Sequence, residues 1–283
     1  MTMRTVRSAL LGLGVMLVVG VAAQAASPDA SVPTKLIESD GHKIAFHVTP
    51  GHLPIIVLDA GGGNDSSYWN TLVPVLSAKT GCEIITYDRA GFGESDEVSG
   101  PWNVQSATTD LENGLQALGA TKNVILVAHS LAGEIATYLA RQHPDWVSGA
   151  VMVDANVPEF FTDKENARAQ AMYKPLIAAA KAAPPSKSDR QLLQVAESFE
   201  QTARAFHKVT WPRSVPVMVI VSGKTPFPSS KVDADAWRAA HRQFVAAAIN
   251  RHYITATGSS HDVAHDRPDV IIKAITDMIS RVH

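Results

Sequence analysis

The sequence has very little cysteine: Cys82 is the only one among 283 residues. A single thiol cannot form an internal disulfide, which excludes a small disulfide-stapled scaffold. Stability must therefore come from a hydrophobic core, and a chain of this length can build one. Because Cys82 opens the apolar segment CEIITY, we expect a buried structural thiol, in preference to a reactive one.

The sequence also lacks any excess of positive charge. Its 25 Lys and Arg residues are balanced by 27 Asp and Glu residues, which argues against a nucleic-acid partner. No His and Cys residues have the spacing of a zinc site, and the glycine run 61–63 lacks the Lys and Ser or Thr of a phosphate-binding loop. We therefore expect no metal and no cofactor, and a small molecule as the substrate.

Only one long apolar run occurs, and it lies at the N-terminus. The basic segment MTMRTVR precedes SALLGLGVMLVVGVAA, and small residues follow at AQA. This order is typical of a secretory signal peptide, here residues 1–25, although an uncleaved membrane anchor would also fit. We expect cleavage before Ala26 and export to the periplasm or beyond, with no membrane association of the mature chain.

The rest of the chain alternates short apolar runs with helical patterns. TKLIES and KIAFHVT flank an Asp-Gly turn and predict a hairpin. Later runs such as LPIIVLDA, NVILVAH and VPVMVIVSG have no polar alternation, which is typical of parallel strands buried on both faces. An α/β fold with a mostly parallel, doubly wound sheet follows, with helices predicted at 104–118, 131–143, 234–249 and 268–281.

One stretch breaks this alternation. Residues 155–213 carry helical patterns and a Pro-Pro break but no convincing strand. We predict a helical cap here, inserted between the sixth and seventh strands of a core formed by residues 26–154 and 214–283. An insertion at the carboxyl ends of the strands would cover the place where ligands bind in such sheets, whereas a peripheral decoration is the alternative.

Ser130 lies between the apolar run NVILVA and the helical pattern LAGEIATYLARQ. A sharp strand-to-helix turn flanked by small residues exposes a serine oxygen at the edge of a sheet, as a nucleophile requires. Here the flanking residues are Ala128 and Ala132, where glycines are usual, and Gly133 follows. A helix-capping serine without chemistry would also fit this position.

Four segments in order resemble the α/β-hydrolase family, from about residue 34 to the end: LDAGGGNDSSYW, TYDRAGFGESD, AHSLAGEIA and SSHDVAHDRPDVI. The resemblance implies a serine hydrolase whose nucleophile, acid and histidine follow in that chain order. Ser130 would be the nucleophile and His261 the general base. His129 and His265 are expected to be structural, and Asp262 and Asp266 to serve the local loop.

The triad acid is less defined by the resemblance. Many relatives place it after the seventh strand, but VSGKTPFPSS contains no carboxylate there. Asp154, at the end of the sixth strand, is the favoured candidate, because some relatives carry the acid at that position. Asp233 and Asp235 remain open alternatives, although either could instead cap or charge the start of the next helix.

The resemblance also implies an oxyanion hole made by the backbone N–H groups of Leu131 and Gly62. Where the family often has His-Gly, this chain has Ala60-Gly61, so the anchoring of that loop needs another group. Asp59 could supply it by accepting local backbone hydrogen bonds.

A serine nucleophile implies an acyl-enzyme formed from a carboxylic ester or lactone. Acyl transfer to another acceptor, including perhydrolase-like chemistry, and a non-catalytic binding protein are the alternatives. Bulky side chains in the predicted cap favour a small-to-medium apolar substrate: Phe160, Phe161, Met172, Tyr173, Leu176, Phe199, Phe206 and Trp211.

Overall fold

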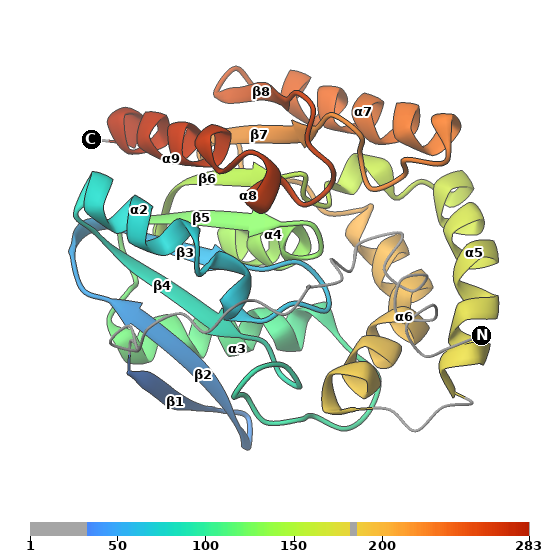
Figure 1. Ribbon diagram of the computed structural model, residues 1–283, viewed down its shortest axis with the longest axis horizontal. Coiled ribbons are helices and arrows are strands. Elements are labelled where there is room, and N and C mark those ends of the chain that lie inside the picture. The colour runs from blue at the N-terminus through green and yellow to red at the C-terminus, as the bar shows by residue number, and fades with distance from the viewer. Residues whose placement is uncertain (1–32, 182–185, 283) are drawn as a thin grey trace.

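The apolar runs form one eight-stranded sheet at the centre of the molecule (Figure 1). The computed structural model describes residues 33–181 and 186–282, so the predicted signal peptide, residues 1–25, lies outside the described residues. The strands are β1 (Thr34–Ser39), β2 (His42–Thr49), β3 (His52–Asp59), β4 (Cys82–Asp88), β5 (Val124–His129), β6 (Val147–Val153), β7 (Val217–Ser222) and β8 (Arg251–Ala256).

The order of the strands is β1-β2-β4-β3-β5-β6-β7-β8. The hairpin β1–β2 is antiparallel and β2 also runs antiparallel to β4, whereas all pairs from β4 to β8 are parallel. Because β5 and β7 are buried along their whole length, both faces of the sheet are covered. The predicted α/β fold with a mostly parallel sheet is therefore confirmed.

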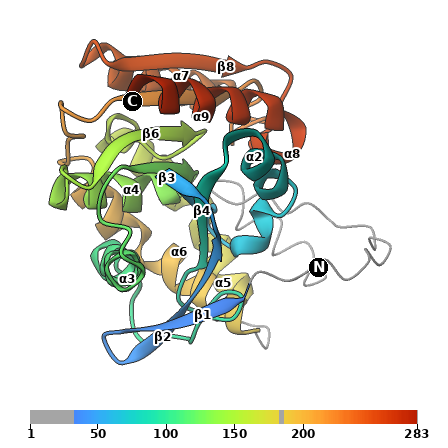
Figure 2. The same cartoon turned by 90° about the vertical axis from the view of Figure 1, so that its left-hand side faces the viewer.

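Two layers of helices cover the faces of the sheet, as Figures 1 and 2 show together. On one face, α2 (Leu72–Thr80) and α9 (Pro268–Val282) share a core with β3, β5 and β6. On the other face lie α3 (Val104–Leu118), α4 (Ala132–Gln142) and α7 (Lys231–Ala246). Short turns complete the core: the 3-10 helices η1 (Ser66–Trp69) and η2 (Pro158–Phe160), and α8 (Val263–Asp266).

The stretch between β6 and β7 contains the helices α5 (Asp163–Lys181) and α6 (Lys187–Phe206), which pack on each other. Figure 1 shows the pair beside the sheet, at the end towards which the parallel strands run. The aromatic side chains of this stretch are mostly in the core: Phe160 packs on Phe227 and Trp237, and Phe206 is fully buried. The side chains of Met172, Tyr173 and Leu176 lie outside the described part of the structure.

Candidate active site

Ser130 is the first residue of the two-residue turn between β5 and α4. Its φ of 55° is in the left-handed region, which marks a sharp and strained change of direction. The turn brings the chain against the segment after β6, because the Asn156 N–H donates to the Ser130 carbonyl at 2.8 Å. At Gly133 a Cβ would lie 2.4 Å from the Asn156 carbonyl oxygen, so this glycine permits the close approach.

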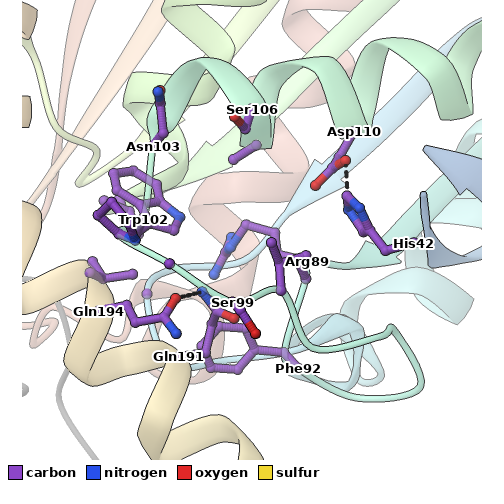
Figure 3. A pocket seen from close by; sticks show the side chains of 18 of the residues that line it. His42, Arg89, Phe92, Ser99, Trp102, Asn103, Ser106, Asp110, Gln191 and Gln194 are labelled. Carbon is purple, nitrogen blue, oxygen red and sulfur yellow. Dashed lines mark hydrogen bonds and ion pairs between the residues drawn. The ribbon is translucent and has the colours of Figure 1, made fainter. Parts of the chain in front are cut away.

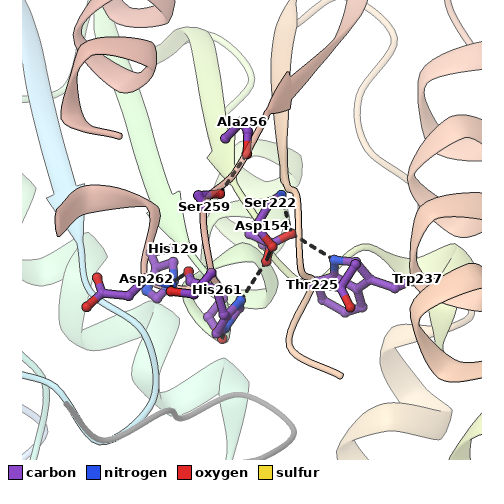
Figure 4. A network of polar contacts seen from close by, with 12 residues as sticks. His129, Asp154, Ser222, Thr225, Trp237, Ala256, Ser259, His261 and Asp262 are labelled. Atoms are coloured by element: carbon purple, nitrogen blue, oxygen red, sulfur yellow. Dashed lines mark hydrogen bonds and ion pairs between the residues drawn. The ribbon is translucent and has the colours of Figure 1, made fainter. Parts of the chain in front are cut away.

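The structure brings Ser130, His261 and Asp154 into one buried row. His261 Nε2 lies 3.0 Å from Ser130 Oγ, and His261 Nδ1 lies 2.7 Å from Asp154 Oδ2. His261 follows β8 and Asp154 follows β6, so three strand ends meet at this point. Figure 4 shows His261 pointing at Asp154. The distances allow a proton to pass from the serine to the imidazole while the carboxylate orients the ring.

Four hydrogen-bond contacts hold the carboxylate of Asp154. Its Oδ1 accepts from the Ser222 N–H at 3.1 Å and from Trp237 Nε1 at 2.8 Å, while its Oδ2 accepts from Ser222 Oγ at 2.5 Å and from His261. Burial alone would raise the pKa of this carboxyl, but the hydrogen bonds from His261 and Ser222 and the charge of His261 lower it to about 2. Asp154 is therefore an anion at neutral pH despite being fully buried.

The two alternative acids have other partners: Asp233 lies in the first turn of α7 and Asp235 two residues later. Asp233 accepts from Ser230 and pairs with Arg168. Asp235 pairs with Lys231 near the surface. These contacts are at the start of the helix and at the surface, as expected of residues that cap or charge a helix start and do not serve as the triad acid.

His129 lies between the nucleophile turn and the histidine loop. Its Nε2 bonds the His261 carbonyl oxygen at 3.0 Å, and its ring stacks on Tyr68 with 4.9 Å between centroids. Burial lowers the pKa of His129 to about 3, so the ring is neutral. A Cβ on Gly61 would lie 2.6 Å from His129 Nδ1, so the glycine loop also packs on this ring.

The remaining polar residues of the histidine loop shape the loop itself. His265 Nδ1 lies 2.8 Å from Asp262 Oδ1, and Asp266 accepts from the Ser260 N–H at 2.7 Å. These contacts are local.

Leu131 directly follows Ser130, and Gly62 belongs to the glycine loop, where a Cβ on the neighbouring Gly61 would lie 3.1 Å from Ser130 Cβ. Within residues 33–181 and 186–282, neither backbone N–H donates to another backbone group. An amide N–H next to a buried serine needs an acceptor, so both groups are suited to bind an oxyanion.

The glycine loop is anchored by Arg89, a residue that sequence reasoning did not single out. Arg89 follows β4, and its guanidinium donates to the carbonyl oxygens of Ala60 and Gly61. It also pairs with Asp59, whose other oxygen accepts from Tyr87 Oη at 2.8 Å. Asp59 thus holds the loop through a cation and not, as expected, by accepting local backbone bonds. The signal available in the sequence was a charged residue directly after an apolar strand, because an arginine buried there requires a partner. That signal does not say which groups the partner would be.

A cavity of about 170 Å³ opens beside this loop. Its lining includes Gly62, Gly63 and Leu131, together with His42 of β2 and residues of α3, α6 and the turn after β4, several of which Figure 3 labels. The part of a substrate remote from its reacting carbonyl could lie here.

Other predicted features lie away from this cavity. Cys82 is buried beneath α2, and burial raises the pKa of its thiol. Among the described residues, no three His, Cys, Asp or Glu side chains are grouped as a metal site requires. In the same part of the chain, no helix is both long and apolar enough to cross a membrane.

The chain is similar to several known proteins. The chain is 26% identical to the uncharacterized protein YqjL of Bacillus subtilis over 226 residues, 79% of this chain and 82% of that one. It is 33% identical to the putative carbamate hydrolase RutD of Klebsiella pneumoniae over 105 residues, only 36% of this chain and 37% of that one. An esterase from Exiguobacterium antarcticum has a similar fold, with a TM-score of 0.63 at 17% identity over 87% of this chain and 98% of that one.

The profile of the Alpha/beta hydrolase family matches residues 56–274, most of the chain. That match runs from within β3 into α9 and includes Ser130, Asp154 and His261. The chain belongs to the alpha/beta hydrolase family of enzymes.

Proposed function

We propose that this protein hydrolyses carboxylic esters or lactones through a Ser130–His261–Asp154 triad and an acyl-enzyme. The observation that carries the proposal is the row of hydrogen bonds from Asp154 through His261 to Ser130, at 2.7 and 3.0 Å. Beside this row lie the N–H groups of Leu131 and Gly62, which donate to no other backbone group of the described residues. A serine in this setting attacks an electrophilic carbonyl carbon.

The reaction would proceed in two halves. Ser130 Oγ attacks the carbonyl while His261 Nε2 takes its proton, and the N–H groups of Leu131 and Gly62 bind the oxyanion. His261 then gives the proton to the leaving alcohol, and water, activated by the same imidazole, releases the acid. Asp154 keeps the proton of His261 on Nδ1, so that Nε2 faces the serine as an acceptor.

The relatives support this class of reaction. The names of the matched proteins describe a carbamate hydrolase and an esterase, and both activities cleave an acyl carbon–heteroatom bond. In the proposed triad the nucleophile Ser130, the acid Asp154 and the histidine His261 follow in the chain order that this family uses.

We assign the pair α5–α6 the role of a cap over the site. Its support is that Gln191, Gln194 and Val195 of α6 line the cavity beside the glycine loop. The opposite walls include Phe92 and Trp102, so a small-to-medium substrate with an apolar portion fits. The aromatic residues Phe160 and Phe206, on which the sequence-based expectation rested, pack in the core instead.

Labelling with a fluorophosphonate tests the proposal. We expect intact mass spectrometry to show one adduct on the native protein and none on the Ser130→Ala variant. A folded native protein without an adduct would favour a binding protein over an enzyme. Added alcohol then separates the two reactions of the acyl-enzyme: formation of a new ester in place of acid would identify an acyltransferase.

We also propose export, on the strength of the basic, apolar and small-residue order of residues 1–25. Exported material should begin at Ala26 when its N-terminus is sequenced. An intact Met1 would instead favour a membrane anchor.

A further inference from the structure

The cavity beside the glycine loop has one wall formed by the α6 helix. Figure 3 shows Gln191 and Gln194 reaching from this helix towards the chain that carries Ser99 and Trp102. The volume of about 170 Å³ is close to that of a protein cavity of about 150 Å³ that binds benzene. The cavity can therefore hold a group about the size of one six-membered ring.

Gln191 brings an unpaired acceptor to this space. The side chain is only 3% exposed, and its Nε2 donates to Gln194 Oε1 at 3.0 Å. Its Oε1 is buried and has no hydrogen-bond partner among the described residues. A buried amide oxygen without a donor is unfavourable, and a ligand that supplies the donor removes that penalty.

The position of Gln191 is set by contacts on both sides. A Cβ on Gly91, whose φ is +81°, would lie 2.6 Å from both Cγ and Oε1 of Gln191, so the amide oxygen packs on one side against space that only glycine leaves. The start of α6 is fixed to the same turn: Lys187 Nζ donates to the carbonyl oxygens of Gly93 and Ser95 at 3.0 and 2.8 Å. The acceptor is thus held in place before any ligand binds.

The charged groups at the cavity already have polar partners. Arg89 is paired with Asp59, and Asp110 accepts from Ser39 Oγ at 2.6 Å and lies 2.9 Å from His42 Nε2. Among the described lining residues, Asp110 is the one carboxylate and is already engaged by Ser39, and the Gln191 oxygen faces any ligand carboxylate with a partial negative charge. A neutral donor is favoured, because an unpaired ion buried here would be costly.

We propose that Gln191 selects esters or lactones whose part remote from the reacting carbonyl carries a neutral hydrogen-bond donor. The donor is a hydroxyl or an amide N–H on a group about the size of a six-membered ring, and Phe92 and Trp102 cover its apolar faces. This inference rests on the proposed esterase function and adds the substrate class to it.

The test uses matched ester substrates. On the acyl side these are methyl para-hydroxyphenylacetate, its para-methoxy analogue and methyl phenylacetate. On the alcohol side they are para-hydroxyphenethyl acetate, its para-methoxy analogue and phenethyl acetate. In at least one series, we expect the native protein to prefer the hydroxyl compound over both analogues by about tenfold or more in kcat/KM.

The Gln191→Met variant keeps the length of the side chain but removes the acceptor. We expect the preference to fall to within about twofold, mainly through loss of rate on the hydroxyl compound. The matched control is Gln201→Met, an exposed glutamine of the same helix, which should keep the preference.

The native protein alone can overturn the inference, so it does not depend on the variant folding. Equal rates for the three compounds of both series, no turnover of either series, or a preference for the methoxy compound would each refute it. Labelling of Ser130 by the fluorophosphonate distinguishes the two proposals: labelled protein without the preference refutes only the role of Gln191, whereas unlabelled protein refutes the esterase function.

Discussion

Replacing Asp154 by asparagine should abolish most of the activity by changing the tautomer of His261. In the native site, Oδ1 accepts from two obligatory donors, the Ser222 N–H and Trp237 Nε1. The amide oxygen of an asparagine must stay there, because its NH₂ group has no acceptor at that end. The NH₂ group therefore occupies the place of Oδ2, facing His261 Nδ1 and Ser222 Oγ.

An amide N–H that faces Nδ1 requires that nitrogen to be unprotonated. The neutral imidazole then carries its proton on Nε2, where it faces Ser130 Oγ and cannot accept the proton of the nucleophile. In a serine protease the corresponding change lowers kcat by about 10⁴-fold with the geometry intact, equivalent to about 5 kcal/mol of transition-state stabilisation. We expect a loss of the same order here, because every polar atom of the substituted side chain would keep a partner and the variant should fold.

The assay is the steady-state rate on an activated ester, with circular dichroism to verify the fold. The Asp233→Asn and Asp235→Asn variants are the matched controls, and they should stay within a few-fold of the native rate because their partners are Ser230, Arg168 and Lys231. If Asp154→Asn retains nearly full activity, or a control loses as much, the assignment of the acid is wrong.

Three further predictions concern buried groups around the site. Burial raises the pKa of Glu134 to about 7, so its contribution to stability is full below the unfolded value of 4.5 and is lost as the pH rises through about 7. Between about pH 5 and 8, urea denaturation should therefore show the Glu134→Gln variant gaining roughly 2–3 kcal/mol in unfolding free energy relative to the native protein. A difference between the two proteins that does not change with pH would contradict this. Gly61→Ala should lower kcat by about tenfold or more, because its Cβ would meet His129 Nδ1 at 2.6 Å and shift the glycine loop; an unchanged kcat would show that the ring can move away. Arg89→Met should lower the free energy of unfolding by about 3–5 kcal/mol, measured in urea at neutral pH, since it leaves the Asp59 carboxylate buried without its cation. A loss below about 1 kcal/mol would mean that the pair contributes little.

The sheet could be predicted from the sequence because its signal is local. A run such as CEIITYD is apolar without alternation, and β4 occupies those seven residues, Cys82–Asp88. The helix α3 also has the predicted bounds, since Asn103 caps its start and Gly119 ends it. By contrast, α2 was not predicted, because LVPVLSAKT contains a proline and has no clear polar face.

The parts of the site that sequence reasoning missed depend on contacts between distant segments. Arg89 follows a strand, and nothing near it in the chain reveals that it reaches Ala60 and Gly61. The choice between Asp154 and Asp233 was open for the same reason. Asp154 follows a strand and Asp233 begins a helix, and only the packing of the chain brings Asp154 to His261. The sequence does not indicate that Gln191 of α6 lies at the cavity. In a helix with many polar residues, the pattern does not show which face packs on the core.

The turn after β4 connects the two halves of the site. Arg89, at its start, fixes the carbonyl groups of Ala60 and Gly61 and so holds the glycine loop that carries Gly62, the proposed oxyanion donor. Further along the turn, the carbonyl oxygen of Gly93 accepts from Lys187, and Glu97 binds Arg190 through two contacts of 2.7 Å, which fix the start of α6. One segment therefore positions both the glycine loop and the helix that carries Gln191. It follows that a change in this turn should lower the rate on every substrate and also alter the choice among them, whereas a change at Gln191 should lower the rate only on substrates that carry the donor.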